Sequence, residues 1–489
     1  MIGCITVCLM FSAAIVFADS QDFKETVAPF PPPVEGWTSY AASIKFSNDM
    51  NHMAYVASKD KQVAVVHNGK IGPLYDGIGQ DTPVFSPDSK RMGYKAKKGG
   101  KWHLVVDDKE LPSYEAVSAP GFSPDSKRLL YVAKKGEKQC LIVDGKGAGC
   151  FDAVMKDHMG FSRDSNRWAA IVIKDKKQVV VIDGKEGPAY EKLTPPLFSP
   201  DTRHVAYTAN RGEKWVVIVD GKEVASHEAT GVFVYSPDSQ HLHYVFKKGD
   251  KWRTMVDGKE GQAYDGLGIP VFSPDGKRLS QTAIRGEKWH MIVDGKEEAP
   301  WDEIFVLSYS PDSKRIAYNT RKGKQRFMVV DGQASTAYDV ASMAIFSPDS
   351  RHVAFAARKG DKWFVVKNGR EETAYNSVST PLFSPDGKHI AYLAQKGNVW
   401  LMVIDGKEGP TYASVANPVW SPDSRHLAYM AERSGLWLIC VGDHAAKNAF
   451  AGFLKGSTIQ FISPNHLRAL ATRPSKIGVD FIKYEIEIP

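Results

Sequence analysis

Apolar and polar positions alternate along this chain in short runs that end in turn residues. Runs of four to seven residues with period-two alternation, separated by Gly-, Pro- and Asp-containing turns, predict β-strands rather than helices. The Asp405-Gly406 pair illustrates one such turn, because it supplies the positive φ that a tight hairpin requires. Within one stretch of 35 residues the pattern predicts four strands, over residues 381–384, 390–394, 400–404 and 409–415.

This four-strand unit recurs along the chain. The aromatic or equivalent residue of its Phe-Ser-Pro-Asp motif stands at Phe46, Phe85, Phe122, Phe161, Phe198, Tyr235, Phe272, Tyr309, Phe346, Phe383, Trp420 and Ile462. From Phe161 to Trp420 the step is 37 residues every time. A fixed period of this size indicates a repeat architecture, and four short antiparallel strands per repeat is the content of one β-propeller blade. The sequence therefore predicts an all-β propeller of about twelve blades.

The repeated Phe-Ser-Pro-Asp-Ser/Gly-Lys/Arg, followed by an apolar Ala-Tyr strand, resembles the WD40-like repeat of TolB-type propellers over residues 34–489. The resemblance implies a propeller fold. It implies no particular function, because propellers of this kind have many different roles. TolB-type proteins also carry an α/β domain before the propeller, and no stretch of that kind is predicted here, so the resemblance does not extend to the Tol system.

The two ends of the repeat region predict how the propeller closes. Residues 35–43 match the fourth-strand pattern of residues 408–414, whereas the last repeat has only three strands, over 457–462, 466–472 and 479–488. We expect the N-terminal strand to complete the last blade, because such closure leaves no open sheet edge. One ring of twelve blades and two rings of six both remain possible, and the unbroken 37-residue step favours one ring.

The first residues predict export. Residues 1–18 are apolar and end in Val16-Phe17-Ala18, which is typical of a signal peptide, although an uncleaved anchor is the alternative. Residues 19–33 read as a Pro-rich linker before the repeats of residues 34–489. No other stretch is long and apolar enough to cross a bilayer. We therefore expect a periplasmic or secreted protein with no stable transmembrane span after cleavage of the signal.

Three cysteines follow the signal segment, and two of them, Cys140 and Cys150, stand on either side of a predicted hairpin turn. A disulfide across that hairpin is possible in an oxidising compartment, and two small buried apolar side chains are the alternative. No cysteines or histidines have the spacing of zinc ligands, and no phosphate-binding loop is present, so we expect no metal and no cofactor.

Catalytic motifs are absent. The aspartates of the Ser-Pro-Asp motif, such as Asp88, Asp125, Asp201, Asp275 and Asp386, recur in nearly every repeat and are interpreted as groups that cap turns. An enzyme with a site in the central channel is kept as the alternative to a scaffold. It would be a hydrolase or lyase acting on a glycan, peptide or lactone. Its candidate residues break the repeat and are Asp157, His158, His227 and Glu303.

Basic residues gather in the loops between the second and third strands of the repeats. The candidates for a binding rim are Lys97, Lys98, Lys134, Lys135, Lys247, Lys248, Lys322, Lys324 and Lys359, in a chain of net charge +7 and pI near 8.8. Such a rim would attract an acidic protein or an anionic polymer, although Lys-Gly-Asp/Glu-Lys is also good hairpin chemistry. The sequence favours an exported, non-catalytic scaffold that binds another protein or an anionic envelope component. Nucleic acid is not expected as a partner of an exported protein.

Overall fold

The computed structural model describes residues 23–31, 33–454, 458–475 and 478–489, so the predicted signal peptide of residues 1–18 lies outside the described residues. The described chain is an all-β protein with twelve antiparallel blades of the β-propeller type, numbered 1–12 here. Each blade has four strand positions, first to fourth in chain order, except that the fourth strand of blade 12 comes from the N-terminal segment. One 3-10 turn, η1 (Ala41–Ser43), interrupts the strands.

The first strand of a blade is either continuous or split by an irregular segment. It is continuous in blades 4, 6, 8 and 11, as β17 (Ala153–Phe161), β26 (Ala229–Tyr235), β35 (Glu303–Tyr309) and β49 (Ser414–Trp420). In the other blades it has two pieces: β2 (Thr38–Ser39) and β3 (Lys45–Phe46), β7 (Gly77–Ile78) and β8 (Val84–Phe85), β12 (Ala116–Val117) and β13 (Gly121–Phe122), β21 (Lys192–Leu193) and β22 (Leu197–Phe198), β30 (Gly266–Leu267) and β31 (Val271–Phe272), β39 (Val340–Ala341) and β40 (Ile345–Phe346), β44 (Ser377–Val378) and β45 (Leu382–Phe383), β53 (Gly452–Phe453) and β54 (Gln460–Ser463).

The second and third strands form the central hairpin of every blade. The second strands are β4 (Met53–Lys59), β9 (Met92–Lys98), β14 (Leu129–Lys135), β18 (Trp168–Lys174), β23 (Val205–Arg211), β27 (Leu242–Lys248), β32 (Leu279–Arg285), β36 (Ile316–Lys322), β41 (Val353–Lys359), β46 (Ile390–Lys396), β50 (Leu427–Arg433) and β55 (His466–Ser475). The third strands are β5 (Gln62–His67), β10 (Lys101–Val106), β15 (Lys138–Val143), β19 (Lys177–Ile182), β24 (Lys214–Val219), β28 (Lys251–Val256), β33 (Lys288–Val293), β37 (Gln325–Val330), β42 (Lys362–Lys367), β47 (Val399–Ile404), β51 (Leu436–Val441) and β56 (Gly478–Glu487).

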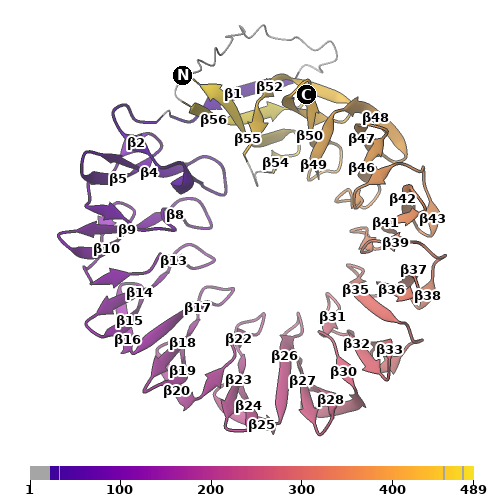
Figure 1. Cartoon of the computed structure of the whole chain (residues 1–489), viewed down its shortest axis with the longest axis horizontal. Coiled ribbons are helices and arrows are strands. Elements are labelled where there is room, and N and C mark those ends of the chain that lie inside the picture. The colour runs from indigo at the N-terminus through magenta and orange to yellow at the C-terminus, as the bar shows by residue number, and fades with distance from the viewer. Residues whose placement is uncertain (1–22, 32, 455–457, 476–477) are drawn as a thin grey trace, which may run out of the picture. The chain divides into compact units, whose positions relative to one another are not determined.

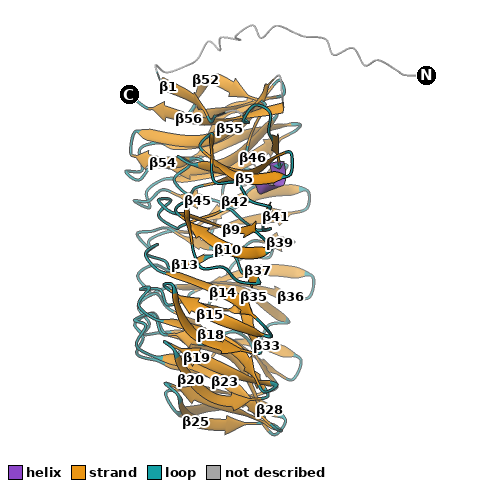
Figure 2. Cartoon of the chain, turned by 90° about the vertical axis from the view of Figure 1, so that its left-hand side faces the viewer, coloured by secondary structure: helices purple, strands orange, loops and turns teal. Residues whose placement is uncertain are grey.

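The fourth strands follow Asp-Gly or Asn-Gly turns in nine blades and vary in length; blade 2 has Asp107-Asp108 and blade 11 has Gly442-Asp443 at this turn. They are β6 (Lys70–Ile71), β11 (Lys109–Glu110), β16 (Lys146–Phe151), β20 (Lys185–Tyr190), β25 (Lys222–His227), β29 (Lys259–Tyr264), β34 (Lys296–Glu297), β38 (Gln333–Ala334), β43 (Arg370–Glu371), β48 (Lys407–Tyr412), β52 (His444–Phe450) and, in blade 12, β1 (Lys24–Pro29). In Figure 2 the strands are orange and the connecting loops of residues 30–374 gather at the two ends of the strands.

The chain forms two compact units. Residues 30–374 hold blades 1 to 9, which follow one another from β2 to β43 (Figure 1), and residues 375–489 with the segment before Phe30 hold blades 10 to 12. A pair of six-bladed rings would place a boundary after blade 6. The division falls after blade 9 instead, and blades 6 and 7 lie in the same compact unit.

The cores lie between neighbouring blades and are built from the second and third strands. In β46 the small Ala391 and the large Tyr392 are both fully buried, and Met402 and Val403 of β47 are buried beside them. The same pattern holds in most blades because alternate side chains of a twisted sheet point to the two blades on either side. Among the described residues, no helix is long and apolar enough to cross a membrane.

The strand that completes blade 12 is β1, which pairs antiparallel with β56 from Lys24 opposite Glu487 to Pro29 opposite Ile482. Closure by an N-terminal strand is thus confirmed, but the strand is not the one predicted. The predicted segment, residues 35–43, joins blade 1 instead, where Thr38 and Ser39 pair with β4. The first strand of blade 1, from Thr38 to Phe46, is two residues longer than that of blade 10, from Ser377 to Phe383, and η1 accommodates the extra residues. The match of residues 35–43 to a fourth strand was therefore out of register with the blades.

Candidate functional site

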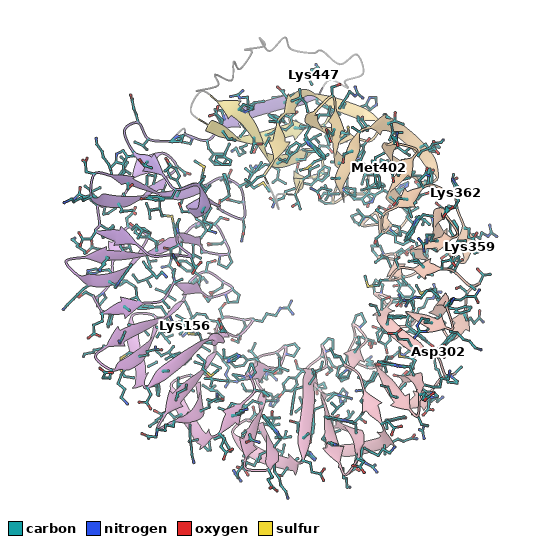
Figure 3. All side chains as sticks on the ribbon, viewed as in Figure 1. Lys156, Asp302, Lys359, Lys362, Met402 and Lys447 are labelled. Carbon is teal, nitrogen blue, oxygen red and sulfur yellow. A yellow bond between two sulfur atoms is a disulfide. The ribbon has the colours of Figure 1, made fainter. Side chains whose placement is uncertain are left out.

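The nine predicted rim lysines stand where the sequence placed them, at or beside the hairpin turns between the second and third strands of blades 2, 3, 6, 8 and 9. We call this end of the blades the rim end. Figure 3 shows Lys359 on the ribbon beside Lys362, across the turn of blade 9. The hairpins are tight because their glycines adopt positive φ, as at Gly136 (59°) and Gly360 (57°).

Several rim cations have an acidic partner in the same blade. The ammonium of Lys98 lies 3.1 Å from Glu110, and that of Lys248 lies 3.3 Å from Glu260; Lys359 also pairs with Glu371. The partner is always the fourth-strand glutamate twelve residues further on. The same offset gives the pairs Lys174–Glu186, Arg285–Glu297 and Lys396–Glu408. These pairs neutralise part of the positive charge that the sequence assigned to the rim.

Other rim lysines lack that partner because the repeat changes at the twelfth position. Twelve residues after Lys135 the chain has Gly147, and twelve residues after Lys322 it has Ala334, so neither lysine has the glutamate. Within the described ranges, six of the nine rim lysines take part in no ion pair: Lys97, Lys134, Lys135, Lys247, Lys322 and Lys324. The rim therefore keeps uncompensated positive charge on blades 2, 3, 6 and 8, with two such lysines on each of blades 3 and 8.

A second set of acids at the rim end joins consecutive blades. Asp302, just before β35, accepts a 2.6 Å hydrogen bond from the ammonium of Lys288 in blade 7 and another from the backbone N–H of Gly323 in blade 8. The bond from Lys288 is the main reason that the pKa of Asp302 lies below its ordinary value. Asp152 does the same with Lys138 and the N–H of Asp175. At the rim end, Asp302 and Asp152 thus use their charge to connect consecutive blades.

The opposite end of the blades carries the Ser-Pro-Asp turns and the Asp-Gly-Lys turns. In the Asp-Gly-Lys turns Asp144 has φ 51° and Gly145 has φ 76°. Two successive positive φ values define the type I′ hairpin turn, which explains the Asp-Gly sequence. The lysine that follows is therefore the first residue of the fourth strand, and its side chain is exposed in blade after blade.

These fourth-strand lysines form the most uniform charged feature of residues 30–374. They occur in seven successive blades, 1 to 7, as Lys70, Lys109, Lys146, Lys185, Lys222, Lys259 and Lys296. All seven are exposed, and none takes part in an ion pair with another described residue. The sequence analysis did not single them out.

The acids beside the fourth-strand lysines already have partners, which is why the lysines have none. In blade 4 the turn residue Asp183 accepts a 2.9 Å bond from the guanidinium of Arg167, and Glu186 is paired with Lys174. In blade 7 the corresponding pairs are Arg278–Asp294 and Arg285–Glu297. Each Asp-Gly-Lys-Glu segment of this kind therefore presents one positive charge that is not balanced within its blade.

The Ser-Pro-Asp aspartates cap turns, as predicted. Ser384 donates a 2.6 Å hydrogen bond to Asp386, which also accepts the backbone N–H of Lys388. These bonds lower the pKa of Asp386 to about 2. The backbone N–H of Asp386 in turn donates to the hydroxyl of Ser424 in the next blade at 2.9 Å. Equivalent turn-to-turn bonds recur, for example from Asp88 to Ser126.

The four residues of the enzyme alternative are not brought together. Asp157 and His158 lie in β17 of blade 4, His227 ends β25 of blade 5, and Glu303 begins β35 of blade 8. His227 packs against Phe246 with ring centroids 4.1 Å apart, and Glu303 pairs with Arg321 at 3.0 Å. Figure 3 shows Lys156, beside Asp157, projecting away from its blade. In the part of the chain that the structure describes, no group of three or more His, Cys, Asp or Glu residues is arranged to hold a metal ion.

Cys140 of β15 and Cys150 of β16 form a disulfide across the hairpin of blade 3. They are directly opposite one another in the strand register. The remaining described cysteine, Cys440, is buried in β51, and burial raises the pKa of its thiol to about 11.

Comparisons with known proteins identify no family: no protein-family model and no curated protein matches the chain. Several solved structures are similar to it. A eukaryotic initiation factor is 14% identical with a TM-score of 0.33, covering 74% of this chain and 95% of its own. TolB from Acinetobacter baumannii is 15% identical with a TM-score of 0.24, covering 53% of this chain and 78% of its own. The β-propeller domain of the Trilobed protease from Pyrococcus furiosus is 12% identical with a TM-score of 0.24, covering 62% of this chain and 96% of its own.

Proposed function

We propose that this protein is an exported, non-catalytic β-propeller scaffold that binds an acidic partner, either another protein or an anionic polymer of the cell envelope. Export is supported by the apolar segment of residues 1–18 and by the Cys140–Cys150 disulfide. Disulfides of this kind form and persist in oxidising compartments such as the periplasm or the extracellular space.

The row of fourth-strand lysines carries the proposal. Seven successive blades each present one exposed ammonium group whose neighbouring acids are, in most of these blades, bound to other cations. Like charges repeated at one structural position add to a field that attracts an anionic surface from a distance. Because the positions recur with every blade, an extended partner can contact several lysines at once.

The rim lysines contribute a second, weaker cationic surface at the other end of the blades. Glutamates neutralise Lys98, Lys248 and Lys359, so its remaining charge lies at Lys134 and Lys135 of blade 3, at Lys322 and Lys324 of blade 8, and singly at Lys97 of blade 2 and Lys247 of blade 6. We therefore assign the partner primarily to the fourth-strand lysines rather than to the rim that the sequence indicated.

The proposal is tested with two probes, poly-glutamate for an acidic protein and polygalacturonate for an anionic polysaccharide. Binding to the mature chain is measured by biolayer interferometry at about 0.01 M and about 0.15 M salt, where the Debye length is about 30 Å and about 8 Å. One variant replaces four fourth-strand lysines by glutamine, at Lys146, Lys185, Lys222 and Lys259. The matched control replaces the same number of rim lysines, Lys134, Lys135, Lys322 and Lys324.

We expect the wild type to bind at least one probe at low salt and more weakly at the higher salt, because counterions screen the attraction. The fourth-strand variant should bind at least about tenfold more weakly, whereas the rim control should lose less, because its four lysines belong to only two blades and their removal leaves the row of fourth-strand lysines intact. If neither probe binds at low salt, or if the fourth-strand variant binds like the wild type, the proposal is wrong.

A further inference from the structure

A groove of about 800 Å³ lies along blades 10 and 11 and extends to Ile488 and Pro489 after β56 of blade 12, at the end of the strands that carries the Ser-Pro-Asp and Asp-Gly turns. Its lining includes His389, Asp405, Trp420, Ser424, Arg425 and Asp443. The volume is within the range of small-molecule sites. All of these residues belong to the unit of residues 375–489.

At five other junctions between blades an arginine occupies the corresponding place, whereas elsewhere in blades 1 to 11 a histidine stands at this repeat position, as His204 and His241 do. At the junction of blades 3 and 4, the guanidinium of Arg128 donates through Nε to Asp144 at 2.9 Å. Its Nη1 donates to the carbonyls of Ser165 and Asn166 at 3.0 and 2.7 Å. Its Cζ lies 5.0 Å from the centre of the Phe161 ring. At this junction of blades 3 and 4, the chain's own Arg128 thus fills the place between the two turns.

The arrangement is repeated with little variation. Arginines at the same repeat position lie over the aromatic ring of the next blade at 5.0–5.6 Å and donate to a turn aspartate and to one or two carbonyls; they are Arg91, Arg128, Arg167, Arg278 and Arg315. A carboxylate, carbonyl oxygens and an aromatic face together are the surroundings that suit a planar guanidinium. The repeat therefore builds a guanidinium site at these junctions.

Two departures from the five arginine junctions meet in the groove between blades 10 and 11: a histidine at the arginine position, which five other blades share, and an inverted turn, which among blades 1 to 11 occurs in blade 11. The arginine is replaced by His389, whose Nδ1 lies 2.6 Å from Asp405 and whose ring is 5.9 Å from that of Trp420. An imidazole is too short to extend to the next turn. Within the described chain, no donor reaches the carbonyls of Ser424 and Arg425, which correspond to those that arginine contacts elsewhere.

The second departure is an inverted turn. In blade 11 the usual Asp-Gly is replaced by Gly442-Asp443, so the carboxylate moves one position along the chain. The equivalent aspartate of blade 10, Asp405, accepts bonds from His389 and from the N–H of Ile390. Asp443, by contrast, is exposed and forms no ion pair with any described residue. The groove thus contains an uncompensated carboxylate.

We propose that this groove binds a guanidinium group supplied by a ligand, in the place that the chain's own arginines occupy at five other junctions. The carbonyls of Ser424 and Arg425 and the carboxylate of Asp443 would accept its N–H groups. The Trp420 indole would offer the aromatic face, and tryptophan is the strongest aromatic partner for a cation. The inference does not depend on the fourth-strand lysines.

The ligand is either an arginine side chain of a partner protein or a small guanidino compound. Both are tested on the mature chain by isothermal titration with three probes. The probes are N-acetyl-arginine methylamide, methylguanidinium and, as the charge-matched comparison, N-acetyl-lysine methylamide. Tighter binding of the arginine amide than of methylguanidinium indicates a peptide source, and equal binding of the two indicates a small guanidino compound.

Two variants test the site from opposite directions. His389→Arg restores the residue that five junctions use and should fill the groove from within, so that binding of the arginine probe is lost. Asp443→Asn removes the free carboxylate and should weaken binding at least about tenfold. The matched controls are Val399→Arg, which adds an arginine at the other end of blade 10, and Asp361→Asn, at an exposed turn of blade 9.

Both controls should bind the arginine probe like the wild type. The proposal is overturned if no guanidinium probe binds at millimolar concentration, or if the lysine probe binds as tightly as the arginine probe. It is also overturned if Asp443→Asn binds unchanged. Because Asp443→Asn alters only an exposed side chain, this result stands even if His389→Arg does not fold.

Discussion

His243 of β27 is a fully buried histidine at a repeat position where most blades have alanine. Seven second strands carry alanine there, namely at Ala54, Ala169, Ala206, Ala317, Ala354, Ala391 and Ala428. Both ring nitrogens of His243 lack a hydrogen-bond partner among the described residues. Burial lowers its pKa from 6.5 to about 4, and its own backbone, the Gln281 side chain and the charge of Asp257 oppose this only in part. The histidine is therefore neutral in the folded protein over most of the pH range.

The sign of the effect follows from this difference in pKa. Above pH 6.5 the histidine is neutral in both the folded and the unfolded chain, so it adds no pH dependence. As the pH falls from 6.5 towards about 4, the unfolded chain binds a proton that the folded chain does not, and the free energy of unfolding decreases. A difference of about 2.5 pKa units corresponds to about 3 kcal/mol.

The perturbation is His243→Ala, which restores the residue of the other blades. We expect the free energy of unfolding of the variant, minus that of the wild type, to rise by about 3 kcal/mol between about pH 7.5 and about pH 4. His67 and His227 also have pKa values lowered by burial, but they are common to both proteins and cancel in the difference.

The assay is hydrogen exchange of the backbone amides of β27 and β32, measured at several pH values and corrected for the intrinsic rate. It reports local opening and does not require the whole chain to unfold in one step. Urea unfolding followed by circular dichroism gives an independent check. A difference between variant and wild type that stays constant from neutral to acid pH would refute the reasoning.

Three further predictions concern the closing strand, the disulfide and the turns. Glu25→Gln should lower the free energy of unfolding of residues 375–489 by about 2 kcal/mol in urea unfolding, because its carboxylate accepts two backbone N–H groups of β52 and the hydroxyl of Tyr484; an unchanged midpoint would contradict this. Cys150→Ser, which removes the bond to Cys140 ten residues away, should cost at most about 3 kcal/mol in thermal unfolding, and reduction of the wild type should match it. Asp386, whose pKa is lowered to about 2 by its hydrogen bonds, should still be ionised in the folded chain as the pH falls past 3.8, where the unfolded chain takes up the proton. The stability that this capping contributes should therefore be lost progressively between about pH 3.8 and about pH 2; a carboxyl NMR titration of the folded chain with a midpoint near 3.8 would show that the capping is absent.

The blades could be predicted from the sequence because their turns are held by local interactions. Ser384 and Asp386 are two residues apart, and their hydrogen bond is formed within the motif itself. The positive φ values of Asp144 and Gly145 follow in the same way from the Asp-Gly pair. Features of this kind can be read from a few neighbouring residues, and twelve similar copies strengthen the reading.

The closing strand could not be predicted in this way. β1 pairs with β56 across more than four hundred and fifty residues, as in the ion pair between Lys24 and Glu487. Nothing within residues 24–29 indicates that partner, and the three prolines that follow favoured a linker. Glu25 shows its role only through hydrogen bonds to Lys447 and Asn448 in β52.

The charged surface was predicted only in part, because a count of lysines does not show which of them are paired. Whether Lys98 is compensated depends on Glu110, twelve residues later. Whether Asp144 remains available depends on Arg128, sixteen residues earlier. Aligning the repeats and comparing these two offsets would have shown that the fourth-strand lysines lack partners, so the signal is present in the sequence.

The hydrogen bond from the backbone N–H of Asp386 to the hydroxyl of Ser424 spans 38 residues, as do the bonds from Asp88 to Ser126 and from Asp312 to Ser350. At every such junction the donor is the aspartate N–H of one Ser-Pro-Asp turn, and the acceptor is the hydroxyl of the serine that follows the aspartate in the turn of the next repeat. A gene duplication that copies one whole repeat with such a serine would supply both groups together, and an excision would remove both. The protein can therefore lengthen or shorten by complete Ser-Pro-Asp-Ser blades without leaving either group unmatched at the new junction, whereas a copied Ser-Pro-Asp-Gly blade, such as those of Gly276 and Gly387, would bring the donor without the acceptor hydroxyl.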